Sequence, residues 1–206
     1  MKRILTVLLA ALLTTVLGGL AAGPSTAAPS GTLRPVRSLD VNRYLGAWWQ
    51  QAAIPGFYSV RCARDTVARY GIIDKTTLSV DNRCISPSGQ PDGIKGKATV
   101  VDTKTNAQLV VSFPGVPNTI DTRGVPNYIV AWVADGAHRG DPYRYAIVGD
   151  PFRVSGFILS RDRVISNGTL LMLRHEAEKL GFNSCLFVTS PTSPAQSGYL
   201  PLCLVR

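Results

Sequence analysis

The sequence is poor in charged residues and in the side chains that most enzymes and metal sites use. Asp, Glu, Lys and Arg make up only 17% of the 206 residues, and the chain holds 2 His, 4 Cys and 2 Met. Charged residues usually account for roughly a quarter of a soluble protein. No run of Lys or Arg exceeds two residues, so the basic segments typical of nucleic-acid binding are missing and we expect no nucleic-acid partner.

Patterns for catalysis and metal binding are also absent from the sequence. It contains no C-x-x-C pair and no G-x-S-x-G motif, and the two histidines, His138 and His175, stand at no ligand spacing from a cysteine. We therefore expect no metal site, no cofactor and no catalytic residues. What the chain does contain is 45% hydrophobic residues with 19 Gly and 14 Pro, which indicates a folded domain with many turns.

The N-terminus has the three-part pattern of a secretory signal peptide. Lys2 and Arg3 precede an uncharged run over residues 4–20, and small residues follow it. The pattern predicts a signal peptide over residues 1–27, cleaved after Ala27, and then a flexible leader over residues 28–38. The alternative is a membrane anchor, but an apolar run of about 17 residues is at the short end of the lengths that span a bilayer.

Export would place the mature chain outside the cytoplasm. The first cysteine is Cys62, so the sequence offers no thiol near the cleavage site to carry a lipid, and we expect a secreted protein without a lipid anchor. Removal of Lys2 and Arg3 with the signal peptide leaves 20 basic against 13 acidic residues, a net charge of +7 in place of +9.

Short apolar or alternating segments, separated by turn residues, follow one another from residue 46 to residue 161. Alternation with a period of two is clearest where Leu109 and Phe113 share one face of a segment. Eight strands with short connections and no intervening helix predict an all-β fold, either an up-and-down antiparallel barrel or a sandwich. The predicted strands are residues 46–54, 62–73, 77–85, 94–102, 107–113, 126–133, 143–149 and 155–161.

One amphipathic helix and a ninth strand are predicted after these segments. Ser166 and Asn167 are candidate N-caps, and Gly181 ends the helix. Residues 185–190 predict a short strand, and residues 191–206 form a tail rich in Pro and Ser. The apolar face of the helix consists of Leu170, Leu173, Ala177 and Leu180.

Two blocks of this sequence resemble the lipocalin family, and within it the branch of the bacterial lipocalins and apolipoprotein D. Residues 40–49, DVNRYLGAWW, are similar to the DVNKYLGxWY opening of that branch and contain its G-x-W motif as Gly46 and Trp48. The segments YAIV and FILSR, which end at Arg161, are similar to its YALV and WILSR block. The resemblance covers residues 39–190 and implies an eight-stranded lipocalin barrel with a C-terminal helix and a short ninth strand.

The resemblance also implies which residues seal the barrel and which line it. Gly46, Trp48 and Arg161 are expected to close the barrel floor, with the guanidinium lying across the indole. The chain departs from the family at Ala134-Asp135-Gly136, where the T-D-Y block is degraded, and at Phe157, where the branch usually has Trp. The positions that line the cavity in this branch correspond to Tyr70, Phe113, Ile129 and Phe157.

The function implied by the resemblance is to bind and carry or sequester one small hydrophobic molecule. The net positive charge favours an anionic amphiphile such as a fatty acid or a lysophospholipid. We expect a monomer that contacts a membrane surface when it exchanges its ligand. Phe57 and Tyr58, in the loop after the first strand, form either a lid over the entrance or an ordinary surface loop.

Four cysteines in an exported chain predict two disulfides, and four allow three pairings. Cys62 opens the second predicted strand and Cys84 closes the third, so both lie at the same end of that hairpin. We prefer Cys62–Cys84 with Cys185–Cys203, which would tie the C-terminal tail to the segment before it. The rival, Cys62–Cys203, would attach the tail to the barrel, as the resemblance to apolipoprotein D implies.

Two functions from other classes are alternatives. A free Cys62 inside a barrel would be a possible nucleophile for an enzyme, since thiolate reactivity does not require a full triad. The tripeptide Arg139-Gly140-Asp141 lies in a predicted turn and would serve an adhesion module.

Overall fold

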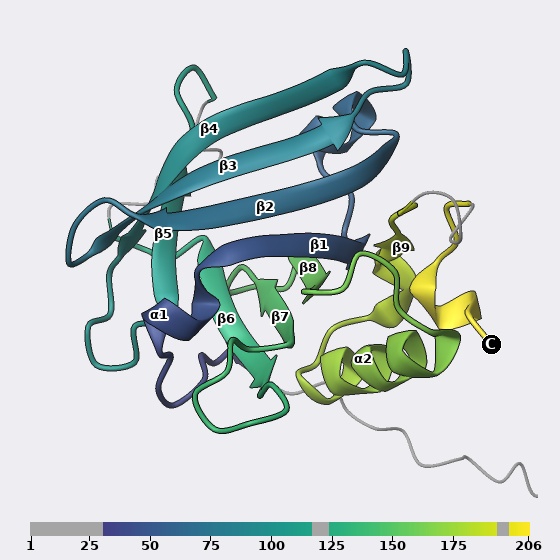
Figure 1. The fold of residues 1–206 in the computed structure, drawn as a ribbon. Coiled ribbons are helices and arrows are strands. Elements are labelled where there is room, and N and C mark those ends of the chain that lie inside the picture. Colours follow the sequence, from purple (N-terminus) through teal and green to yellow (C-terminus); the bar gives the residue numbers. More distant parts are fainter. Residues whose placement is uncertain (1–30, 117–123, 193–197) are drawn as a thin grey trace, which may run out of the picture.

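Eight antiparallel strands close into a barrel, and a short ninth strand pairs with the first on the outside (Figure 1). The computed structural model describes residues 31–116, 124–192 and 198–206. Within them, β2 to β8 are neighbours in chain order, and β1 closes the ring by pairing with both β8 and β2. The predicted barrel is confirmed. The strands are β1 (Gly46–Ala53), β2 (Arg64–Ile72), β3 (Thr77–Ile85), β4 (Pro91–Val100), β5 (Gln108–Ser112), β6 (Tyr128–Ala134), β7 (Tyr145–Gly149), β8 (Gly156–Ser160) and β9 (Val188–Thr189).

Strand β1 changes partner along its length. Its first half pairs with β2 as far as Trp49, which lies opposite Val67. After a bulge at Gln50, Ala52 and Ala53 pair with β9. The extra strand therefore continues the hydrogen bonding of β1 where β1 separates from β2.

In the described part of the chain, two α-helices lie outside the strands, α1 (Val41–Tyr44) and α2 (Asn167–Lys179). Asp40 caps α1 by accepting a hydrogen bond from the Asn42 N–H at 3.0 Å. Ser166, one of the two predicted N-caps, accepts from the Thr169 N–H at 3.1 Å. The sequence predicts α2 and misses α1, because a single turn is too short to show helical periodicity. The short 3₁₀ segments are η1 (Phe57–Arg61), η2 (Ser184–Leu186) and η3 (Leu202–Leu204).

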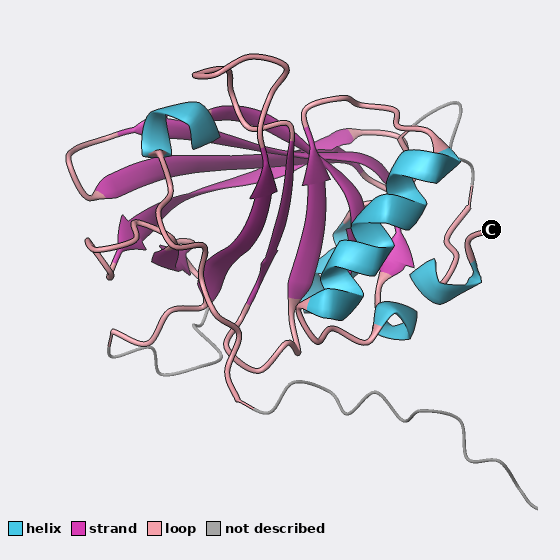
Figure 2. Cartoon of the chain, turned by 90° about the horizontal axis from the view of Figure 1, so that it is seen from below, coloured by secondary structure: helices cyan, strands magenta, loops and turns pink. Residues whose placement is uncertain are grey.

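Two apolar clusters lie on opposite faces of the barrel wall. The outer cluster fills the space between the wall and α2, which packs along the strands in Figure 2, and there Leu173 and Ala177 are fully buried. The inner cluster fills the lower part of the barrel around Trp48. Because successive strand residues point to opposite faces, β6, β7 and β8 contribute to both clusters and read as nearly continuous apolar runs.

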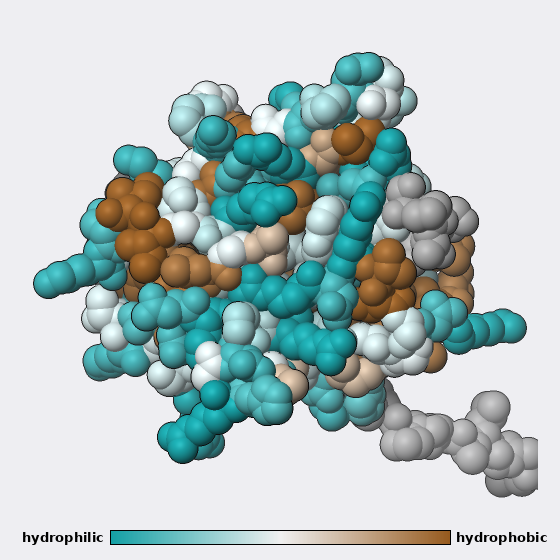
Figure 3. Space-filling model, viewed as in Figure 1, coloured by the Kyte–Doolittle hydropathy of each residue, from teal (hydrophilic) through white to brown (hydrophobic). Residues whose placement is uncertain are grey.

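The outer face of β2, β3 and β4 is exposed to solvent instead. Its side chains include Arg69, Lys95 and Lys97, all of which are exposed. The face seen in Figure 3 is largely hydrophilic, with hydrophobic patches toward its left and right edges. One side of the barrel is thus covered by α2, and the other faces water.

The barrel has a closed end and an open end. At the closed end, which lies on the left in Figure 1, α1 and the turn over residues 73–76 meet. The open end, or mouth, carries η1 and the turns over residues 86–90 and 150–155.

The segment before α1 packs against the barrel from Leu33 onward. Leu33 is buried in the outer cluster and donates its N–H to the Pro151 carbonyl at 2.8 Å, and Val36 donates to Val130 at 2.9 Å. The second half of the predicted leader is therefore attached to the barrel, because its apolar residues find buried partners. The predicted signal peptide lies outside the described residues. Among the described helices, none has the length and apolar character needed to cross a membrane.

Candidate functional site

Arg161 and Trp48 seal the closed end of the barrel. Trp48 is fully buried, and the Arg161 guanidinium carbon lies 3.8 Å from the centroid of its ring. Arg161 also donates hydrogen bonds of 2.8 to 3.0 Å to the carbonyls of Arg43, Ala47 and Tyr143. Burial lowers the pKa of Arg161 to about 10, so the guanidinium remains charged at neutral pH. The stacking expected from the sequence is present.

Gly46 allows β1 to begin directly beside this contact. Its φ is +90°, in a region that side-chain-bearing L residues rarely adopt. A Cβ atom at this position would also lie 3.4 Å from a guanidinium nitrogen of Arg161. Backbone conformation and space therefore both favour glycine here.

Three of the four residues expected to line the cavity lie on the inner face of the wall. Tyr70 is buried in the inner cluster, and Phe113 and Phe157 are half-buried and pack against it. Val111 and Leu109 of β5 lie on the same face. These side chains form the apolar wall of the barrel interior.

Ile129 lies elsewhere, which corrects the expectation from the sequence. It is buried in the outer cluster, on the side of the wall that faces α2. Its neighbours Tyr128 and Val130 belong to the inner cluster, and alternation along β6 therefore turns Ile129 outward. Since β6 is apolar on both faces, its sequence does not show which residues point inward.

Three tyrosine hydroxyls meet inside the barrel beside Trp48, and we call Tyr44, Tyr70 and Tyr128 the tyrosine cluster. The Tyr70 hydroxyl donates to Tyr128 at 2.9 Å, and the hydroxyl oxygens of Tyr44 and Tyr128 are 2.8 Å apart. The ring of Tyr44 lies 5.0 Å from that of Trp48. Sequence reasoning identified only Tyr70, because Tyr44 comes from the unpredicted α1 and Tyr128 from β6.

Burial keeps the tyrosine cluster protonated. It raises the pKa of Tyr70 to about 12 and raises the pKa values of Tyr44 and Tyr128 well above the ordinary value. All three side chains are therefore neutral hydroxyls over the whole physiological pH range.

The exposure of inward-facing side chains increases from the floor to the mouth. On β4, Ala98 is buried and Ile94 is half-buried, and on β2, Tyr70 is buried and Ala68 is half-buried. Asn82 shares the inward face of β3, and its Oδ1 is buried with no hydrogen-bond partner among the described residues. The inward-facing side chains are thus buried at the floor and partly exposed toward the mouth.

The cysteines form the two preferred disulfides, Cys62–Cys84 and Cys185–Cys203. Their Cα–Cα distances of 5.5 and 4.8 Å lie within the normal range. The first disulfide attaches the loop after η1 to the mouth end of β3. The second ties the C-terminal tail to the segment before β9, and the rival pairing Cys62–Cys203 is excluded in this structure.

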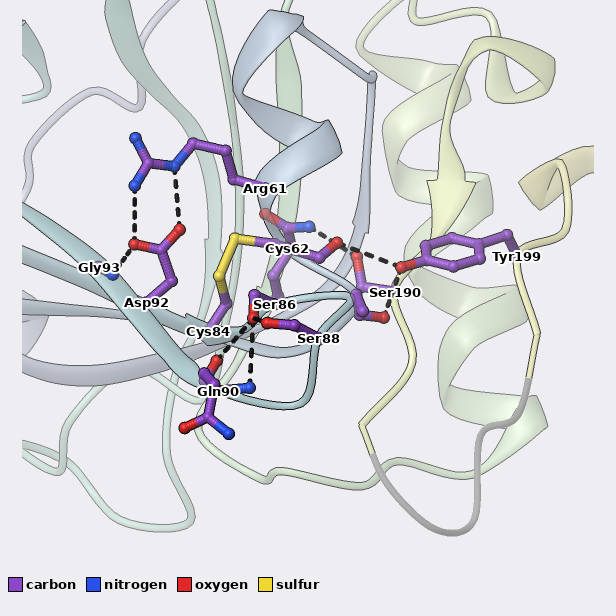
Figure 4. The surroundings of a disulfide bond; sticks show 12 residues. Arg61, Cys62, Cys84, Ser86, Ser88, Gln90, Asp92, Gly93, Ser190 and Tyr199 are labelled. Carbon is purple, nitrogen blue, oxygen red and sulfur yellow. Dashed lines mark hydrogen bonds and ion pairs between the residues drawn. A yellow bond between two sulfur atoms is a disulfide. The ribbon is translucent and has the colours of Figure 1, made fainter.

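The tail also contacts the mouth beside the first disulfide (Figure 4). The Tyr199 hydroxyl donates to the carbonyls of Cys62, at 3.3 Å, and of Ala63. Gln50 of β1 donates to the Ser190 hydroxyl at 2.6 Å. These residues border a cleft of ≈ 90 Å³ where β1 separates from β2.

Tyr58 of η1 covers part of the mouth. Its ring stacks on Phe157 with the centroids 6.3 Å apart, and burial raises the pKa of its hydroxyl. Phe57 is 64% exposed. Of the two candidate lid residues, Tyr58 contacts Phe157 of the inner wall, and both Tyr58 and Phe57 are exposed at the surface.

Two residues that the alternative functions would use, Cys62 and Asp141, are bonded to other groups in the structure. Cys62, the candidate nucleophile, is in a disulfide, and His138 and His175 are both exposed. In the turn that contains Arg139-Gly140-Asp141, the Asp141 carboxylate accepts from the His138 N–H at 2.8 Å. This carboxylate is thus occupied within its own turn, at the closed end of the barrel.

Comparisons with known proteins agree with this architecture. The family model described as "Lipocalin-like domain" matches residues 39–192. The chain is 30% identical over 176 residues to temperature-induced lipocalin-1 of Arabidopsis thaliana, covering 81% of this chain and 87% of that protein. It is 29% identical over 165 residues to the outer membrane lipoprotein Blc of Escherichia coli, covering 80% of this chain and 85% of that protein. A crystal structure of a lobster apocrustacyanin matches with a TM-score of 0.56 at 14% identity, over 82% of this chain and 95% of that one, which is a likeness of fold.

Proposed function

Because the chain belongs to the lipocalin family, we propose that it binds one small hydrophobic molecule inside the barrel and carries or sequesters it without catalysis. The observation that carries the proposal is a barrel interior that is sealed at one end and lined by increasingly exposed apolar side chains toward the other. Its floor is sealed by Trp48 and Arg161, and its upper wall is apolar and partly exposed. An eight-stranded barrel has room for one small ligand.

The ligand would contact the apolar wall in the upper half of the barrel. Phe113, Phe157 and Tyr70 are the principal contacts, and Ile129 is not among them because it faces α2. Burial of apolar ligand surface contributes about 25 cal/mol per Å². The net positive charge makes fatty acids and lysophospholipids the first candidates.

The protein would act outside the cytoplasm, as a monomer. The signal-peptide pattern before residue 28 supports export, and the two disulfides agree with an oxidising compartment. One similar protein is named an outer membrane lipoprotein, which indicates that a relative works at a membrane.

Ligand exchange would take place in contact with a membrane surface. Large apolar side chains at the mouth are exposed, among them Phe57 and Val60 of the η1 loop and Phe152 and Val154 of the β7–β8 turn. These residues surround the entrance, so a membrane that they touch would face the open end of the barrel.

Native mass spectrometry of the purified protein tests the proposal, together with titration of fatty acids, lysolipids, retinoids and apolar dyes. We expect a co-purified ligand or saturable binding of at least one class. Ala68→Phe, which adds a ring to the half-buried inner wall, should weaken binding, whereas Arg69→Phe adds the same ring on the exposed outer face and should not. Absence of binding across the panel by the folded protein would show that the proposal is wrong.

A further inference from the structure

The tyrosine cluster has one more hydrogen-bond donor than it uses. Tyr44, Tyr70 and Tyr128 carry three hydroxyl protons, and two hydrogen bonds connect them. Tyr70 donates in one bond, and the other uses a proton of either Tyr44 or Tyr128. One proton on Tyr44 or Tyr128 is therefore left without an acceptor among the described residues. Because a buried hydroxyl is costly without a partner, this position favours an oxygen atom that accepts a hydrogen bond.

Two residues of the tyrosine cluster are less completely buried than Trp48 of the floor. Trp48 on the floor is completely buried, whereas Tyr70 and Tyr128 retain 7% and 9% exposure. Ala68, two residues before Tyr70 on the same face of β2, is half-buried. The tyrosine cluster therefore adjoins the part of the inner wall that is partly exposed.

A second polar group inside the barrel is also without a partner. Asn82 lies two residues beyond Val80 on the inward face of β3, and Val80 is the register partner of Tyr70. At about 3.4 Å per residue, Asn82 is roughly 7 Å closer to the mouth than Val80. Its Oδ1 atom is buried and unpaired among the described residues. Two unsatisfied polar groups at different depths indicate an interior built for a ligand that is not purely hydrocarbon.

The surroundings of the cluster favour an uncharged oxygen. The inner cluster around it consists of apolar and aromatic side chains. The nearby cation, Arg161, stacks on the Trp48 ring and already donates to three backbone carbonyls. A buried carboxylate beside Tyr128 would thus compete with these carbonyls for Arg161, which is costly, whereas a neutral carbonyl needs only the spare hydroxyl proton.

We propose that the tyrosine cluster is a polar subsite that receives the neutral carbonyl oxygen of an apolar ligand, which enters the barrel with its carbonyl end first. This inference rests on the proposed binding function, and it replaces the anionic amphiphiles named there with neutral carbonyl compounds as the first ligand class. The ligand class is an apolar chain or ring system that ends in a ketone, aldehyde, ester or amide. Phe113 and Phe157 would contact its hydrocarbon part nearer the mouth.

A comparison of two matched probes tests the subsite. A long-chain methyl ketone and the n-alkane of the same length compete with a bound apolar dye for the wild-type protein. We expect the ketone to bind about tenfold more tightly, since a net hydrogen bond is worth about that factor. A variant with Tyr44→Phe, Tyr70→Phe and Tyr128→Phe removes all three hydroxyls together and leaves none of them orphaned. In this variant the preference for the ketone should disappear.

The control is Tyr145→Phe, the same change at a buried tyrosine of the outer cluster, and it should keep the ketone preference. Thermal melting of each variant confirms that it is folded. Equal affinity of the wild-type protein for the ketone and the alkane would overturn the subsite. A ketone preference that survives in the triple variant would also overturn it. If neither the dye nor any probe binds the wild-type protein, the proposed function itself fails.

Discussion

The Arg161 guanidinium covers the buried ring of Trp48 at 3.8 Å, so two residues that are distant in the chain together seal one end of the barrel. The same guanidinium bonds the carbonyls of Arg43 and Ala47 on the N-terminal side and of Tyr143 on the other side. The contact thus connects the beginning of the barrel to its last strand.

Replacement of Arg161 by Ala should lower the free energy of unfolding by about 3 kcal/mol, because it removes the cation–π contact and leaves buried carbonyls without donors. Urea unfolding measures the change. Arg83→Ala is the control, since Arg83 bonds Asp81 on the exposed outer face of β3 and should cost far less. Equal losses for the two variants would contradict the sealing role of Arg161.

Gly46→Ala should destabilise the protein by about 1–3 kcal/mol, because its φ of +90° is unfavourable for alanine. The comparison is Gly168→Ala in the first turn of α2, where an added Cβ would meet only the Ser166 hydroxyl at 3.8 Å. There the helix should tolerate or favour alanine. The unfolding temperature should therefore fall for Gly46→Ala and stay unchanged or rise for Gly168→Ala. An unchanged unfolding temperature in Gly46→Ala would contradict the backbone argument.

Removal of either disulfide by a pair of Cys→Ser substitutions should cost about 3 kcal/mol, since the two bridges close loops of similar length, with sequence separations of 22 and 18 residues. Denaturant unfolding gives the loss. Peptide mapping under non-reducing conditions checks the pairing directly, and a peptide that joins Cys62 to Cys203 would show that the pairing is different.

The buried tyrosines predict a loss of stability at high pH. A tyrosine that ionises near pH 10 when unfolded but at about 12 when folded, as Tyr70 does, favours the folded state fully below pH 10. This contribution is lost as the pH rises from 10 through about 12. Alkaline unfolding should therefore coincide with a late step in tyrosinate absorbance. In the variant with Phe at positions 44, 70 and 128 that late step should be absent, and its persistence would place the late-titrating tyrosines elsewhere.

The apolar residues at the mouth should promote binding to phospholipid vesicles. Phe57→Ser combined with Val60→Ser removes two exposed apolar side chains beside the entrance and should weaken co-sedimentation with anionic vesicles several-fold. The matched control is Ile72→Ser combined with Ile73→Ser, which alters exposed apolar residues at the closed end. Equal effects of both pairs would mean that membrane contact is not directed through the mouth.

Local sequence patterns were sufficient for the strands and for α2. Turn residues and alternation place eight strands close to their observed bounds, with β3 (Thr77–Ile85) matching completely. The N-cap of α2 follows from Ser166, since a short polar side chain before an apolar helical face is a local signal. The G-x-W motif and Arg161 indicate the floor from the sequence alone.

By itself, the sequence determined the barrel, the helix and the residues of the floor, because each depends on short-range periodicity, turn chemistry or a family motif. It left two disulfide pairings open, and the structure shows the preferred one. Only the tertiary structure decided which face of β6 points inward, and with it that Tyr128 lies inside and Ile129 outside. The physical reason is that a strand buried on both faces has no polar positions to mark its orientation. The tyrosine cluster joins α1, β2 and β6 through hydroxyl contacts 58 and 84 residues apart in the chain, and such contacts exist only once the barrel has closed.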